Sequence, residues 1–237
     1  MSEILLFGGS GKLGTAIKEA VSGTNLITPA HNECDITDPA QVKKFMADIH
    51  PQVVINAAAI VGTRECEENK RLAWQTNVNG ALYIARYCQE ARARCVLISS
   101  AAIFDGLKGQ YTEEDPPTPT FYYAVTKVAA EQVVQMVSDH AVVRLDFFPR
   151  DRLKYPQVFD DHFTSKISVD EAAKKILKIA QSCYQGVINI GQERRSLFAI
   201  LQSHFPYIEP IKIADSPLPN FPRDISLDLS KWKQNFE

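Results

Sequence analysis

Cysteine clusters, long apolar runs and an excess of one charge are all missing from this sequence of 237 residues. The five cysteines show no CxxC or Cys/His spacing, so neither a zinc site nor a disulfide framework is indicated. No apolar run is long enough to span a bilayer, and the N-terminus lacks the pattern of a signal peptide. A formal net charge of -2 gives no electrostatic reason to expect nucleic acid or a membrane as partner. We therefore expect a cytoplasmic protein with reduced thiols and no metal.

The first part of the chain alternates short apolar runs with longer amphipathic ones. The pattern predicts strands at 4–7, 26–28, 53–56, 96–99 and 141–145, and helices at 12–22, 39–49, 72–93 and 122–138. Strands that are apolar throughout, separated by helices, are typical of a parallel sheet covered on both faces. The predicted fold class is therefore α/β, with a Rossmann-type doubly wound parallel sheet.

The pattern changes after Asp146. Residues 147–163 are rich in proline and aromatic residues and predict a loop, followed by helices at 169–182 and 196–203 and a strand at 186–190. The segment beyond Ile211 holds several prolines and is expected to wrap the surface. We therefore expect a Rossmann domain over residues 1–145 and a small, shortened C-terminal lobe over 146–237 that completes a cleft.

Residues 4–14 read ILLFGGSGKLG, a strand that leads through a turn into a helix. Gly8, Gly11 and Gly14 have GxxGxxG spacing, close to the GxGxxG fingerprint of dinucleotide-binding proteins. Glycines let the backbone approach a pyrophosphate at a helix N-terminus, and Gly14 would let the helix pack closely on the strand. A P-loop is excluded because Leu13, and not serine or threonine, follows Lys12. The turn predicts a dinucleotide site.

The second predicted strand lacks the acid that usually binds the ribose 2′-hydroxyl. Its end reads LITPAHNE, where Glu33 has no certain register. Without an acid, nothing repels a 2′-phosphate. We therefore expect NADPH or NADH as cofactor, with NADPH favoured.

Tyr123 and Lys127 form a YxxxK pair on a predicted helix. Positions i and i+4 share a face, so the hydroxyl and the ammonium point into the same volume. A nearby cation is expected to lower the pKa of the tyrosine from about 10, and the tyrosine can then protonate the alkoxide formed in carbonyl reduction. The lysine can also bond the cofactor ribose. Alone, such a pair is more often a solvated surface pair.

Two neighbouring strand ends strengthen the catalytic interpretation. Ser99 and Ser100 follow the strand at 96–99, where parallel sheets form their ligand crevice, and Ser100 can hold the substrate oxygen beside Tyr123. The stretch 56–59, Asn-Ala-Ala-Ala, leaves room for a flat cofactor against the sheet. We therefore interpret Ser100, Tyr123 and Lys127 as catalytic residues of an oxidoreductase.

In these motifs the sequence resembles the extended short-chain dehydrogenase/reductases, and within them the dTDP-4-dehydrorhamnose reductases. The resemblance covers most of the chain and is carried by GGSGKLG, CDITDP, VINAAA, ISSAAIFDG, YTEEDPPTPTFYYAVTKVAAE and PRDISLDLSKWKQNF. It implies reduction of a 4-keto-6-deoxy sugar nucleotide by NAD(P)H, with Tyr123 as proton donor. It also implies that the first domain binds the cofactor and the second lobe the substrate.

Carried over by position, the resemblance implies which residues meet the ligands. The implied cofactor contacts are Gly8, Gly11, Lys12, Leu13, Asp35, Ile36, Ala57, Ala58, Ala59, Ser99, Tyr123 and Lys127. Among them, Lys12 and Leu13 would meet the pyrophosphate, and Asp35 and Ile36 the adenine end. The implied substrate contacts are Ser100, Ala101 and Phe147.

The sequence also departs from the family pattern. Ala101 and Ala102 replace an acid and a tyrosine, the substrate lobe is short, and no final helix is expected. Two alternatives therefore stay open: an epimerase or another reductase of a nucleotide sugar, or a non-catalytic cofactor-binding regulatory subunit. A homodimer is compatible with this fold. Arg144, at a strand end, is interpreted either as a phosphate contact or as the anchor of a carboxylate.

Overall fold

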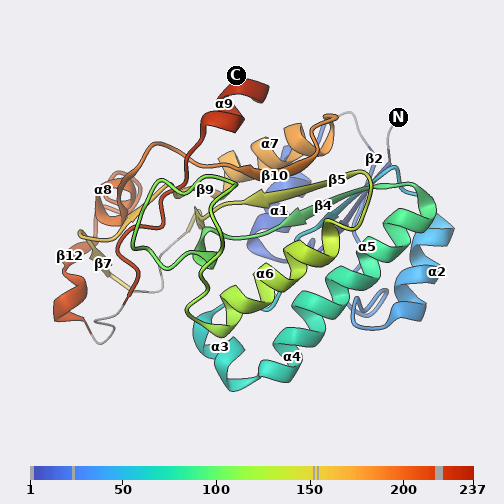
Figure 1. The fold of residues 1–237 in the computed structure, drawn as a ribbon, viewed down its shortest axis with the longest axis horizontal. Coiled ribbons are helices and arrows are strands. Elements are labelled where there is room, and N and C mark those ends of the chain that lie inside the picture. The colour runs from blue at the N-terminus through green and yellow to red at the C-terminus, as the bar shows by residue number, and fades with distance from the viewer. Residues whose placement is uncertain (1–2, 23–24, 152, 154, 217–220) are drawn as a thin grey trace.

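A six-stranded parallel sheet forms the centre of the computed structural model, which describes residues 3–22, 25–151, 153, 155–216 and 221–237 (Figure 1). The strand order is β10-β5-β4-β3-β1-β2, and every pair is parallel. The strands are β1 (Glu3–Phe7), β2 (Asn25–Ile27), β3 (Val53–Asn56), β4 (Arg94–Ile98), β5 (His140–Arg144) and β10 (Gly186–Asn189). The predicted α/β doubly wound sheet is confirmed.

Helices cover both faces of the sheet (Figure 1). One face carries α1 (Lys12–Ala20) and α7 (Val169–Ala180), which pack against each other. The other face carries α2 (Pro39–Ile49), α5 (Gly80–Ala91) and α6 (Tyr122–Val134). The sheet is thus buried on both sides, as its uniformly apolar strands predict.

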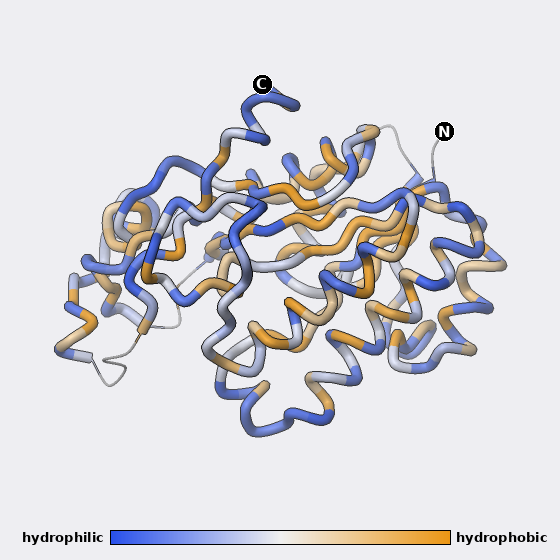
Figure 2. The backbone as a smooth tube through the Cα atoms, viewed as in Figure 1, coloured by the Kyte–Doolittle hydropathy of each residue, from blue (hydrophilic) through white to orange (hydrophobic). Residues whose placement is uncertain are grey.

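Side chains alternate across each strand, which divides the core into two layers. In β1, Ile4 and Leu6 join the cluster under α1 and α7, whereas Leu5 and Phe7 join the cluster under α2, α5 and α6. All four are at most 1 % exposed. Burying a side chain of this size contributes about 1.5–3 kcal/mol. Figure 2 shows the apolar residues concentrated along the central strands.

Several helix ends follow local sequence signals. Asp38 caps α2 by accepting hydrogen bonds from Ala40 N and Gln41 N, with Pro39 at the first helical position, as expected. Ser168 and Glu171 form a capping box at the start of α7. The long helix predicted at 72–93 consists of α4 (Lys70–Trp74), a π-helical turn η1 (Gln75–Asn79) and α5.

Some elements differ from the prediction. A helix α3 (Thr63–Glu68) occupies a stretch with no predicted element. The expectation of no final helix is wrong, because α9 (Ser230–Phe236) ends the chain. Trp232 of α9 is 4 % exposed and stacks on Phe236 at 4.7 Å between ring centroids, and Lys175 Nζ of α7 lies 4.2 Å from the Trp232 ring centroid. A tertiary contact, and not a strong local pattern, holds this helix.

The C-terminal lobe contains short strands where a loop is predicted. Three two-stranded sheets form there: β6 (Phe147–Phe148) with β9 (Ile167–Ser168), β7 (Gln157–Phe159) with β12 (Glu209–Ile211), and β8 (Phe163–Thr164) with β11 (Arg195–Ser196). Together with α8 (Leu197–Leu201), they enclose a small apolar core of their own. However, two elements of the same segment are part of the central fold: β10 is the edge strand of the central sheet, and α7 packs on that sheet. No described helix has the length and apolar character needed to cross a membrane.

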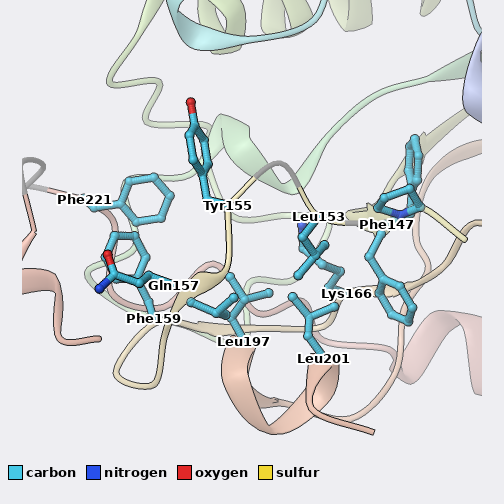
Figure 3. Close-up of a pocket in the computed structure, with 12 residues that line it drawn as sticks. Phe147, Leu153, Tyr155, Gln157, Phe159, Lys166, Leu197, Leu201 and Phe221 are labelled. Carbon is cyan, nitrogen blue, oxygen red and sulfur yellow. The ribbon is translucent and has the colours of Figure 1, made fainter. Parts of the chain in front are cut away.

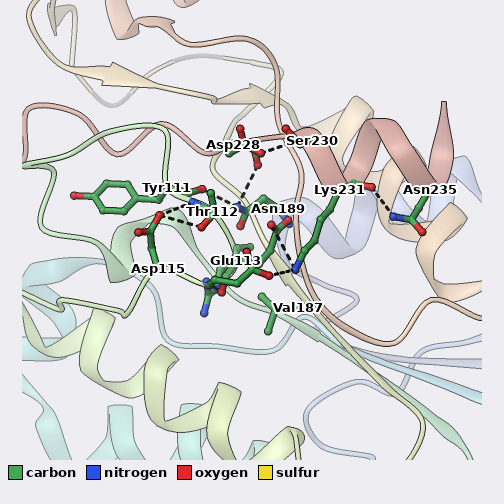
Figure 4. A network of polar contacts seen from close by, with 12 residues as sticks. Tyr111, Thr112, Glu113, Asp115, Val187, Asn189, Asp228, Ser230, Lys231 and Asn235 are labelled. Carbon is green, nitrogen blue, oxygen red and sulfur yellow. Dashed lines mark hydrogen bonds and ion pairs between the residues drawn. The ribbon is translucent and has the colours of Figure 1, made fainter.

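A polar network joins the loop at 105–119 to β10 and α9 (Figure 4). The buried Asn189 donates from Nδ2 to Tyr111 O at 2.9 Å and to Asp228 O at 3.2 Å, and its backbone N donates to Glu113 Oε1 at 2.8 Å. Lys231 Nζ lies 3.9 Å from Glu113 Oε2 and also pairs with Glu114. The network anchors the loop that leads into α6.

Candidate active site

The glycine turn lies where the strand order reverses, between β1 and β3. Gly8 has φ +85°, and a Cβ there would lie 2.6 Å from Ala58 N at the end of β3. A Cβ on Gly14 would lie 2.2 Å from Gly8 O. Both glycines are therefore required by the fold itself, since any side chain would push the turn away from its neighbours.

The start of α1 offers an anion site. Gly11 is the N-cap, and no described side chain caps the helix, so its first N–H groups are available. Lys12 is exposed, whereas Leu13 is 6 % exposed and packs into the core, which leaves its backbone N–H as the group able to meet a phosphate. A hollow of about 260 Å³ adjoins the turn, between Ser10, Lys12 and Thr15 on one side and Arg150 on the other.

The expected adenine end is ordered by its own hydrogen bonds. Asp35 Oδ1 accepts from Thr37 N and Thr37 Oγ1 at 2.9 Å each, and Ile36 is buried. Glu33 is exposed, and its carboxylate accepts from Ala30 N at 2.7 Å. The Glu33 carboxylate therefore stabilises its own loop. This agrees with the expectation that no acid at this position binds the cofactor ribose.

The alanines at 57–59 form a half-buried ledge beside the turn. Asn56 Oδ1 accepts from Ala58 N at 3.2 Å and fixes the course of the chain as it leaves β3. Beyond the ledge, the π-helical Asn77 accepts from Ile60 N at 2.8 Å and donates to Ile60 O and Thr126 Oγ1 at 3.0 Å each. Asn77 thus joins the ledge to α6, a role that the sequence interpretation missed.

Tyr123 stands in the first turn of α6, which begins at Tyr122. Burial raises the pKa of Tyr123 to about 12, with a hydrogen bond to Ser100 acting in the opposite direction and Asp146 adding to the rise. The predicted lowering of this pKa by Lys127 is wrong for this state of the protein. A raised pKa keeps the phenol protonated at neutral pH, which is the form that a proton donor requires.

Lys127 lies one turn further along the same helix and is 3 % exposed. Its Nζ donates to Ile98 O, at the end of β4, at 2.6 Å. Burial lowers the pKa of Lys127 to about 8, and the charge of Glu131 partly offsets this shift. The ammonium is therefore turned toward the strand end and does not act as the cation that lowers the pKa of Tyr123.

The two serines after β4 have different surroundings. Ser100 is half-buried and accepts from Ala102 N at 3.1 Å as the cap of the short helix η2 (Ala101–Ile103). Ser99 is 4 % exposed and donates to Glu131 Oε1, so its side chain faces the core and only its backbone could meet a cofactor. Ala101 is 1 % exposed within an apolar cluster. Its side chain therefore does not line the site, contrary to the expectation that it contacts the substrate.

Arg144 is the anchor of a carboxylate. It is 3 % exposed, and its Nη2 lies 2.8 Å from Oε2 of the fully buried Glu131. Arg144 Nη1 also donates to Glu113 O at 3.2 Å. Of the two interpretations, a phosphate contact is therefore wrong, because the guanidinium is occupied inside the protein.

Phe147 lines a cavity of about 240 Å³ in the C-terminal lobe (Figure 3). The wall is largely apolar and aromatic, and the polar side chains Gln157 and Lys166 also reach it. Lys166 pairs with Asp146, which follows β5, and the sequence interpretation singled out neither of these side chains. Among the described residues, no group of three His, Cys, Asp or Glu side chains comes together to hold a metal.

Together these features define a class of protein. A parallel sheet with a glycine turn at its switch point, and a serine, a tyrosine and a lysine gathered at the ends of β4 and the start of α6, are the elements of an extended short-chain dehydrogenase/reductase. Reductases and epimerases that bind NAD(P) share this fold.

Comparison with known proteins agrees with this class. Residues 1–149 match the model of the RmlD substrate binding domain. dTDP-4-dehydrorhamnose reductase of Mycobacterium tuberculosis is 27 % identical over 91 % of this chain and 81 % of that protein. Methionine adenosyltransferase 2 subunit beta of mouse is 29 % identical over 55 % of this chain and 42 % of that protein. The structure of dTDP-4-dehydrorhamnose reductase of Bacillus anthracis in complex with NADP superimposes with a TM-score of 0.91 at 21 % identity, covering 100 % of this chain and 94 % of that one.

The family match spans more than half of the chain. The protein belongs to the RmlD substrate binding domain family of the extended short-chain dehydrogenase/reductases.

Proposed function

We propose that this protein reduces the keto group of a 4-keto-6-deoxy sugar nucleotide with NADPH or NADH. The observation that carries the proposal is the meeting of Ser100 and Tyr123, the latter with a pKa of about 12, at the open end of the parallel sheet. A relative along nearly the whole chain, the reductase of M. tuberculosis, supports the substrate class.

Tyr123 acts as the proton donor. Its phenol is protonated at neutral pH, and Ser100 shares the hydrogen bond that places the substrate oxygen beside it. Lys127 is held by Ile98 O at the strand end, from which it can turn to the ribose of the cofactor. Because its pKa is about 8, Lys127 is charged at pH 7 and loses that charge as the pH rises through 8.

The glycine turn fits a dinucleotide. Gly11, the exposed N-cap of α1, carries no side chain that could obstruct an approaching pyrophosphate, and Lys12 adds a positive charge beside it. When bound there, the reduced nicotinamide supplies the hydride. The exposed Glu33, held by Ala30 N, leaves the ribose free of a fixed acid, so we favour NADPH.

The C-terminal lobe is proposed to hold the substrate, with residues 1–145 as the main part of the cofactor domain. The aromatic and apolar wall that includes Phe147 suits a nucleobase (Figure 3). We also propose that the protein forms a homodimer, which light scattering in solution would test.

The first experiment is the loss of absorbance at about 340 nm from NADPH or NADH with a dTDP-4-keto-6-deoxy sugar. General acid catalysis contributes about 100- to 10,000-fold, so Tyr123→Phe should lower kcat by that factor with little change in cofactor affinity. Tyr122→Phe, on the same helical turn, is the matched control and should keep full activity. Full activity of Tyr123→Phe would refute the assignment of the proton donor.

Two other outcomes lead to different functions. Conversion of one sugar nucleotide into another without net consumption of NAD(P)H would identify an epimerase. Cofactor binding without turnover, together with co-purification of a partner enzyme, would identify a regulatory subunit. The similarity to methionine adenosyltransferase 2 subunit beta makes this second outcome worth testing directly.

A further inference from the structure

An ion pair without a role in the proposed proton transfer lies beside Ser100 and Tyr123. Asp146 follows Leu145, and Leu145 O accepts a hydrogen bond from Ala101 N at 3.0 Å. Asp146 is therefore next to the segment that carries Ser100. Its carboxylate also contributes to the raised pKa of Tyr123, so it lies within electrostatic reach of the phenol. The candidate site thus contains a carboxylate beside the proton donor.

Two side chains of the C-terminal lobe hold this carboxylate. Lys166 Nζ lies 3.0 Å from Asp146 Oδ1, and Thr164 Oγ1 donates to Asp146 Oδ2 at 3.4 Å. The Asp146 and Lys166 side chains are 23 % and 20 % exposed, so both remain accessible to a ligand. A carboxylate can accept about four hydrogen bonds, which leaves Asp146 able to accept another from a ligand.

We propose that Asp146 is a specificity-determining residue that accepts a hydrogen bond from the sugar hydroxyl on the carbon next to the reacting carbonyl, with Lys166 as its positioning residue. This inference rests on the function proposed above. Tyr123 and Ser100 hold the carbonyl oxygen, so a carboxylate beside them faces the neighbouring ring position.

The expected discrimination follows from the surroundings of Asp146. A site that hydrogen-bonds a substrate hydroxyl rejects an analogue without it by about 10,000- to 100,000-fold when its polar groups are left buried and unpaired. Asp146 keeps Lys166 as its partner and is partly exposed to solvent. Loss of the substrate hydroxyl therefore costs less free energy here than in a fully buried site. We therefore expect about 10- to 100-fold preference for the hydroxylated substrate.

The test compares kcat/KM for dTDP-4-keto-6-deoxyglucose and its 3-deoxy counterpart at saturating NADPH. Asp146→Ala should lower kcat/KM for the first substrate about 10- to 100-fold and change that for the second less than about threefold. Lys166→Met should act in the same direction, and Asp146→Asn, which retains an acceptor, should keep part of the preference. Asp160→Ala removes the ion pair with Lys212 in the same lobe and should leave the ratio unchanged.

A second readout separates specificity from a structural role. The charge of Asp146 helps to raise the pKa of Tyr123, which faces Ser100 and Cys66 as well, while Lys166 and His162 lie around Asp146. Asp146→Asn should therefore lower the pKa of Tyr123, which NMR of the ring-labelled tyrosine follows directly. If this variant folds and leaves the substrate ratio unchanged, the inference is wrong, whatever the pKa of Tyr123.

The two proposals fail differently. A wild-type protein that oxidises NADPH with neither substrate would overturn the proposed reduction and this inference with it. A wild-type protein that reduces both substrates equally, or Asp146 variants with an unchanged substrate ratio, would overturn the role of Asp146 alone. If Asp146→Ala does not fold, Asp146→Asn and Lys166→Met decide between these outcomes by the same ratio.

Discussion

Glu131→Gln should be among the most destabilising single changes of a polar side chain in this protein. Glu131 is fully buried beneath the site, and Arg144 approaches it with both Nε and Nη2, the latter at 2.8 Å from Oε2. Ser99 donates to its other oxygen. The amide has almost the same shape as the carboxylate, so the change removes the charge and leaves Arg144 buried without a counter-ion.

The expected loss of stability follows from leaving the buried Arg144 without its counter-ion. Removing one partner of a buried ion pair costs about 3–5 kcal/mol. For a chain of 150–250 residues, each kcal/mol lowers Tm by about 2–4 °C, so the expected fall is about 6–20 °C. The matched control is Glu90→Gln in the pair of Arg86 with Glu90, whose side chains are 65 % and 48 % exposed. An exposed pair contributes less than about 1 kcal/mol.

Thermal and urea unfolding of both variants, followed by circular dichroism, measure the difference. Burial lowers the pKa of Lys127 and the charge of Glu131 partly offsets this, so Glu131→Gln should lower that pKa further and weaken cofactor binding first at alkaline pH. A Glu131→Gln variant as stable as Glu90→Gln would refute the reasoning, since it would mean that Arg144 needs no counter-ion.

Two further predictions concern the glycine turn and the buried Glu113. A Cβ on Gly14 would lie 2.2 Å from Gly8 O, whereas one on Gly11 would lie 3.4 Å from it. Gly14→Ala should therefore lower both Tm and NADPH affinity, and Gly11→Ala should lower NADPH affinity alone. Calorimetry measures Tm and a titration measures the affinity, so together they separate the two effects. Burial raises the pKa of Glu113, so above pH 4.5 the unfolded state releases this proton first and the free energy of unfolding falls as the pH rises. Glu113→Gln, which can still accept from Asn189 N, should make that pH dependence weaker, and an unchanged pH dependence would contradict the account.

The alternation of apolar strands and amphipathic helices was sufficient to predict the central sheet. The β3 strand and the α2 helix have the predicted bounds, because continuous apolar runs and a capped N-terminus are local signals. The helix α9 could not be predicted in the same way, since it is short and Trp232 is buried against α7 as well as against Phe236 of its own helix. The π-helical turn that places Asn77 likewise has no periodic signal of its own.

The candidate site divides along the same line. Its residue types and their order along the chain were readable, because a glycine turn, a strand-end serine and a YxxxK pair carry chemistry in the sequence itself. The surroundings of those residues could not be predicted from the sequence, because they depend on burial and on charges from distant segments of the chain. Ser99 turns to Glu131, Lys127 turns to Ile98 O, and Asp146 comes to lie near Tyr123 only once β5 pairs beside β4. A side chain's identity is local, but its pKa and its partners depend on what the folded chain brings within a few ångströms.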